Sequence, residues 1–191
     1  MNKALKIILW IAGILVVIAL LLYFVVGPKM KESTKKHSPE VTDVYDINDQ
    51  HIEVWYSSPS KKGRTIFGDL VPYGEVWRTG ANEATTFMTD KDLLIDGQTL
   101  PAGKYTLWTI PGEETWQVIF NSKMYDWGVS FMNAKASREE AYDVVVATAD
   151  VTKSYTTEEN FMIKVMEAAG NKPVLLFAWD QVFVTLPMEK K

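Results

Sequence analysis

The chain has 191 residues, no cysteine and a formal net charge of −4; this length suits one domain with a hydrophobic core plus an appendage. The absence of cysteine excludes disulfides, thiolate metal sites, cysteine nucleophiles and lipoprotein acylation. Residues 1–37 carry six lysines against one glutamate, whereas residues 38–191 carry 14 basic against 23 acidic residues, and because such an acidic domain repels phosphate backbones, we expect no nucleic-acid partner.

The first predicted element is a membrane-spanning helix at residues 7–26. This run contains no charged residue, and at about 1.5 Å per residue it spans about 30 Å, the thickness of the bilayer's hydrocarbon core. It is longer than the apolar part of a cleavable signal peptide, and no small-residue cleavage site follows it. We therefore expect residues 1–27 to be an uncleaved signal anchor whose partner is the lipid bilayer. Removal of the segment as a signal peptide is the alternative.

Residues 28–40 are expected to form a juxtamembrane linker, because they are polar, rich in lysine and interrupted by Pro28 and Pro39. Positive charge is balanced on the two sides of the apolar run, so the positive-inside rule does not decide the orientation. The short N-terminal tail favours a cytoplasmic N-terminus. The expectation is a single-pass protein of the cytoplasmic membrane with its soluble domain on the extracytoplasmic, periplasmic side.

Residues 41–187 are predicted to form a mainly β domain. Apolar and polar residues alternate with a period of two, and Asp96-Gly97 and Pro111-Gly112 are typical of turns. The expected strands are 52–56, 83–89, 93–95, 105–110, 116–121, 142–151, 161–166, 174–179 and 182–186, with a turn at 169–173 and one short helix at 134–142. Many short strands separated by turns predict an antiparallel β-sandwich or a jelly roll.

The stretch from Ser57 to Phe87 is too irregular for a helix and too rich in glycine and proline for one strand. It contains PSKKGRTIFGDLVPYGEVWRTGANEATT and is followed by LPAGKYTLWTIPGEETWQVIFN and DWG. These segments resemble the signature of the bacterial domain of unknown function 2911 family, and the resemblance covers residues 41–186. It implies an exported or membrane-anchored β-rich domain. It implies no known activity, and the N-terminal segment departs from the shorter signal sequences of many members.

Polar residues in and after this stretch are the candidate binding site. Loops of such length are functional or carry their own packing, which Phe67, Tyr73 and Trp77 would supply. Arg78 can offer its planar fork to a ligand or to Glu83. The candidate ligand-binding residues are Arg64, Arg78, Asn82, Glu83 and Trp127. We predict that the first four converge at the base of the loop and that Trp127 is an exposed indole.

The sequence provides little for catalysis or metal binding. His51 is the one histidine of the domain, so a zinc site would need three further ligands without cysteine. A serine triad would also have to use His51, and no G-x-S-x-G motif occurs. We therefore assign no catalytic residue, metal or cofactor.

Three functions fit these observations. The first is a membrane-anchored extracytoplasmic domain that binds a saccharide or an anionic small molecule. The second is a structural or envelope protein-interaction domain without a small ligand, in which Arg78 and Glu83 brace the loop. The third is an enzyme of unrecognised type that uses carboxylates of the Ser57–Phe87 stretch as acid and base. The protein partner of the second possibility is not specified by the sequence.

Overall fold

A computed structural model of the chain describes residues 2–47, 49–130, 132–168, 170 and 172–191. The chain divides into two compact units, Met1–His37 and Ser38–Lys191. The first unit is helical, and the second consists mainly of strands. Each unit has its own architecture.

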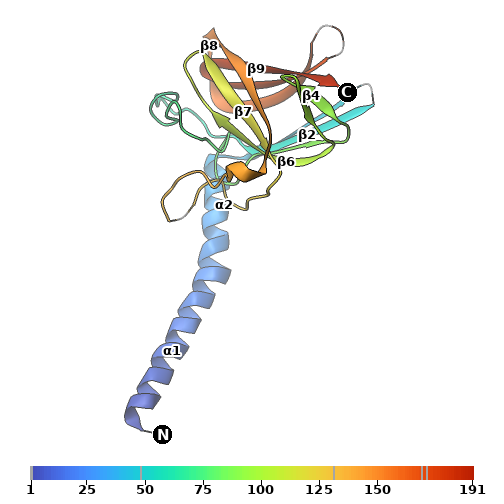
Figure 1. Cartoon of the computed structure of the whole chain (residues 1–191). Coiled ribbons are helices and arrows are strands. Elements are labelled where there is room, and N and C mark those ends of the chain that lie inside the picture. The colour runs from blue at the N-terminus through green and yellow to red at the C-terminus, as the bar shows by residue number, and fades with distance from the viewer. Residues whose placement is uncertain (1, 48, 131, 169, 171) are drawn as a thin grey trace. The chain divides into compact units, whose positions relative to one another are not determined.

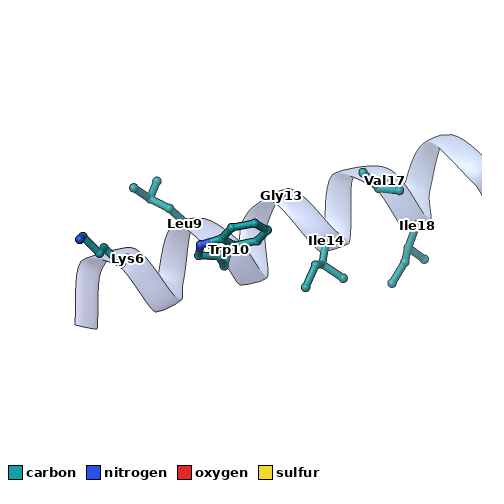
Figure 2. A pocket seen from close by; sticks show the side chains of 7 residues that line it. All are labelled: Lys6, Leu9, Trp10, Gly13, Ile14, Val17 and Ile18. Atoms are coloured by element: carbon teal, nitrogen blue, oxygen red, sulfur yellow. The ribbon is translucent and has the colours of Figure 1, made fainter. Parts of the chain in front are cut away.

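The N-terminal unit is one continuous helix. It comprises α1 (Lys3–Leu21), a π-helical turn η1 (Leu22–Val26) and α2 (Gly27–His37). The helix is long and apolar enough to span a membrane, and its apolar window is not buried inside the described structure. Figure 2 shows side chains of α1 between Lys6 and Ile18; because all of them come from one helix, they form an open and mostly apolar surface. The predicted linker begins as a continuation of this helix.

The domain is a single antiparallel sheet of nine strands. Their bounds are β1 (Glu40–Ile47), β2 (Gln50–Ser57), β3 (Thr86–Thr89), β4 (Leu93–Ile95), β5 (Gln98–Leu100), β6 (Gly103–Ile110), β7 (Thr115–Asn121), β8 (Asp143–Ala168) and β9 (Lys172–Lys190). In space the order is β1-β2-β3-β6-β7-β8-β9-β4-β5. The short hairpin of β4 and β5 is therefore reached through β9, the last strand of the chain.

The long strands β8 and β9 run side by side and bend the sheet onto itself (Figure 1). Their pairing has an ordered block at each end, and the register shifts between Lys153 and Met162. Beyond this point β8 comes close to the first strand of the sheet, because the Val165 N–H donates to Asp43 Oδ2 at 3.0 Å. β1, at one end of the sheet, and the later part of β8 thus both contribute to the main core.

Consecutive residues of β6 and β7 are buried. Because successive residues of a strand point to opposite sides, both faces of these strands are covered. Leu107 and Phe120 belong to the main core, to which most strands contribute. Trp108 and Ile119, their neighbours in sequence, form a smaller cluster with Ala84 on the other face. This second cluster explains why a sheet strand can be apolar at consecutive positions.

Two irregular segments cover the second cluster. The signature segment, residues 58–85, joins β2 to β3 and contributes Val76; the covering segment, residues 122–142, joins β7 to β8 and contributes Tyr125. Neither segment is a helix or a strand over most of its length. Because both lie on the same small apolar cluster, they are brought together on one face of the sheet.

The predicted mainly β, antiparallel fold is confirmed, and hydrogen bonds join all nine strands into one sheet. The helix predicted at 134–142 is wrong, because only Glu140–Tyr142 forms a 3-10 turn. Glu139 instead bonds residues outside the segment, since its carbonyl accepts from Asn121 Nδ2 and its N–H donates to the Tyr125 hydroxyl oxygen, so tertiary contacts override the local helix propensity. The turn predicted at 169–173 lies partly outside the described residues.

Candidate functional site

The signature segment runs back along β6 before it enters β3. Trp77 and Thr109 exchange two backbone hydrogen bonds, of 2.7 Å from the Trp77 N–H and 3.0 Å from the Thr109 N–H. Further along, the Leu107 N–H donates to the Thr85 carbonyl at 2.8 Å. Residues 78–84 are therefore held at both ends against a central strand of the sheet.

Aromatic rings anchor the signature segment to the main core. Trp77 lies 4.8 Å from Phe161 between ring centroids and stacks on Trp179 at 6.0 Å, while Phe67 lies 5.1 Å from Trp116. The predicted packing role of Phe67 and Trp77 is confirmed, whereas that of Tyr73 is wrong, because Tyr73 is 41% exposed. Trp116 and Trp179 are only 2% exposed, so these indoles belong to the core and offer no flat surface to a saccharide.

Residues 78–83 have an unusual backbone. Thr79 and Asn82 have φ of 57° and 60°, a left-handed conformation that is a true outlier for a β-branched threonine. Thr79 is held there by two contacts: its carbonyl accepts from Thr85 Oγ1 at 2.6 Å, and its hydroxyl lies 3.1 Å from that of Thr109. Such a residue costs about 1–3 kcal/mol and is typical of functional sites.

The same six residues leave buried polar atoms without partners. Among the described residues, seven buried side-chain atoms have no hydrogen-bond partner, and Arg78 Nε, Asn82 Nδ2 and Glu83 Oε2 are three of them. No described residue forms an ion pair with Arg78, and burial lowers the pKa of its guanidinium. The described part of the chain thus contains no ion pair between Glu83 and Arg78, which the bracing alternative requires. Each unpaired buried group costs about 1–3 kcal/mol.

The covering segment reaches this site at Gly128. The Gly128 N–H donates to the Asn82 carbonyl at 3.0 Å. A Cβ atom built on Gly128 would lie 2.3 Å from Cδ of Arg78 and 2.6 Å from its Cβ. The bare backbone of Gly128 therefore lies directly against the Arg78 side chain, and this contact joins two segments far apart in the sequence.

A family model described as "Protein of unknown function (DUF2911)" matches residues 38–188. The chain belongs to the DUF2911 family. Comparisons with curated proteins and with solved structures gave no match. The DUF2911 domain thus coincides with the unit Ser38–Lys191, and the resemblance seen in the sequence is confirmed.

The other predicted site residues of the DUF2911 domain lie in different surroundings. Arg64 is exposed and folds back on its own turn, where Nε donates to the Lys61 carbonyl at 3.0 Å and Nη2 to the Ser60 carbonyl at 2.5 Å. Among the described residues no hydrogen bond or ion pair links Arg64 to the segment 78–83. Trp127 is half-buried and precedes Gly128 in the chain. Sequence reasoning missed Gly128 as a site residue, although DWG was part of the recognised signature.

The DUF2911 domain's histidine lies in β2, where it is paired with Asp46 of β1. His51 Nδ1 lies 2.5 Å from Asp46 Oδ1, and the His51 N–H donates to Asp90 at 2.8 Å. The hydrogen bond to Asp46 raises the pKa of His51. In the described part of the chain no group of three or more histidine and carboxylate side chains is placed to hold a metal ion.

Proposed function

We propose that this DUF2911 protein is a membrane-anchored binding module. Its domain lies on the extracytoplasmic side and binds a small molecule that carries an oxyanion and hydroxyl groups, such as an acidic saccharide. The observation that carries this proposal is the half-buried Arg78, whose Nε is buried without an acceptor and which has no anionic partner among the described residues. The binding residues are Arg78, Asn82 and Glu83, with Trp127 at the flank.

The chemistry of the unpaired atoms selects the ligand. A cation removed from water without a partner is destabilising, and a carboxylate or phosphate can relieve this by accepting two parallel N–H bonds from the guanidinium fork. Asn82 Nδ2 is a further free donor, whereas Glu83 Oε2 is a free acceptor. A ligand with an oxyanion and neighbouring hydroxyls satisfies donors and acceptor together. The left-handed backbone at Thr79 and Asn82 supports the same conclusion, because such strain is typical of functional sites.

Ligand binding is tested on the full chain in detergent micelles, with the melting temperature followed by tryptophan fluorescence. The probes are D-glucuronate, D-glucose and acetate, which carry the oxyanion with hydroxyls, the hydroxyls alone and the oxyanion alone. We expect D-glucuronate to stabilise the domain most. At 100 times Kd the gain is about 2.7 kcal/mol, or about 5–11 °C for a domain of this size.

Two variants separate the site from general effects of charge. Arg78→Met should lose the response to D-glucuronate, whereas Arg64→Met, which removes an exposed arginine already bonded within its turn, should keep it. A response that persists in Arg78→Met contradicts the proposal. So does a wild-type protein that responds to neither D-glucuronate nor acetate.

The anchoring is supported by the N-terminal helix, which is long and apolar enough to cross a membrane. Protease treatment of spheroplasts should digest the domain together with periplasmic control proteins. A domain that stays protected reverses the proposed orientation. A mature N-terminus near residue 30 means that the helix is a cleaved signal sequence.

A further inference from the structure

We infer that Gly128 is a positioning residue of the binding site: its bare backbone holds the Arg78 side chain in the orientation that presents the guanidinium to an oxyanion. This inference rests on the proposed function, because the orientation matters only if Arg78 meets a ligand. It adds a residue of the covering segment to a site otherwise built from the signature segment.

The contact between the two residues leaves no space for a side chain at position 128. A methyl group there would lie 2.3 Å from Cδ, 2.6 Å from Cβ and 3.0 Å from Cγ of Arg78. Cβ and Cγ are the base of the arginine side chain, so a small rotation of its far end cannot relieve the overlap. Any residue other than glycine therefore moves either Arg78 or the covering segment.

Gly128 is itself held in place from three directions. Its N–H donates to the Asn82 carbonyl at 3.0 Å, and its carbonyl accepts from the Ser137 N–H at 3.1 Å. The far end of the covering segment is fixed to the sheet, because Asp143 at the start of β8 accepts from both Arg138 and Asn121. The Gly128 backbone is thus held in a fixed position against the Arg78 side chain.

The contact with Gly128 explains how the unpaired Arg78 side chain keeps one orientation. Arg78 Nε is buried and has no acceptor among the described residues, so no hydrogen bond fixes the guanidinium. Packing of the stem against Gly128 fixes it instead. Gly128 also contacts Asn82, whose carbonyl accepts from the Gly128 N–H and whose Nδ2 is also unpaired. Two residues with unpaired donors, Arg78 and Asn82, are therefore both in contact with one glycine.

The test observes Arg78 directly in the full chain. The sequence contains three arginines, Arg64, Arg78 and Arg138, so labelling with 15N-arginine gives three side-chain Nε–H signals, assigned by Arg→Lys variants. Nε of Arg64 and of Arg138 is hydrogen-bonded, and these signals are internal references. In Gly128→Ala we expect the Arg78 signal to shift and its exchange with water to accelerate about tenfold or more, as buried groups do when they open.

Gly112→Ala is the matched control. A Cβ atom at Gly112 would lie 2.5 Å from the Thr115 carbonyl oxygen, so this variant is as crowded as Gly128→Ala but in the turn between β6 and β7. It should leave the Arg78 signal unchanged. The inference is overturned if Gly128→Ala leaves the Arg78 signal and exchange rate as in the wild type, or if Gly112→Ala changes them equally.

A double variant decides the matter if Gly128→Ala does not fold. Arg78→Gly removes Cβ, Cγ and Cδ, the atoms 2.6, 3.0 and 2.3 Å from the added methyl group, and combined with Gly128→Ala it should recover a large part of the melting temperature lost in Gly128→Ala alone. Failure to recover it means that Gly128 does not act through Arg78. In the folded wild type, titration with D-glucuronate should shift the Arg78 signal. If that titration fails while the exchange result holds, the proposed ligand is refuted and the positioning of Arg78 stands.

Discussion

Replacing Arg78 and Arg138 by methionine, one at a time, should affect stability in opposite ways. Arg138 has a buried side chain and Arg78 is half-buried with a buried Nε, and methionine keeps much of the length of the stem. The Arg138 side chain is 8% exposed and bonds Asp143, itself 13% exposed, through Nε and Nη2. Arg138→Met leaves the Asp143 carboxylate buried without its cationic partner, which costs about 3–5 kcal/mol. For a domain of this size the melting temperature should fall by about 6–20 °C.

Arg78→Met leaves no carboxylate without a partner, because no described residue forms an ion pair with Arg78. It removes the free energy spent on desolvating the guanidinium, whose burial lowers its pKa. The melting temperature should therefore stay the same or rise. The assay is thermal unfolding followed by tryptophan fluorescence, with urea unfolding as a check on the free energy. If Arg78→Met lowers the melting temperature as much as Arg138→Met, Arg78 is a structural brace and the binding-site proposal falls.

Three further outcomes follow from single contacts. The hydrogen bond to Asp46 raises the pKa of His51 above the unfolded value of 6.5, so its stabilisation is complete below that pH and is lost as the pH rises through the folded pKa. The melting temperature of the wild type relative to His51→Gln should thus be higher at pH 6 than at pH 9, and equal differences contradict this. Phe161→Ala removes a ring that is 1% exposed and should cost about 3–5 kcal/mol in urea unfolding; a loss below about 1 kcal/mol contradicts the packing described. Arg64→Met at an exposed turn should change stability by no more than about 0.5 kcal/mol, and a larger loss means that its two backbone bonds stabilise the turn.

Local pattern was enough for much of the architecture. The helix over residues 7–26 follows from apolar composition and length, which are those of a segment able to cross a bilayer, where only a helix satisfies its own backbone groups. The hairpin of β4 and β5 follows from Asp96-Gly97, whose φ values are 46° and 71°, a conformation that these residue types adopt readily. Alternation likewise predicted β6 and β7 to within two residues, since side chains of a strand point alternately to two faces.

The arrangement of the candidate site was decided by tertiary structure. The sequence drew attention to Arg78, Asn82 and Glu83, but their unpaired atoms exist only because the surrounding residues exclude water without supplying partners. The contact with Gly128 joins residues 50 positions apart, which no local pattern encodes. For the same reason the helix expected at 134–142 does not form: Glu139 bonds Asn121 and Tyr125, and Ala136 packs against the smaller apolar cluster, contacts that helix propensity cannot represent.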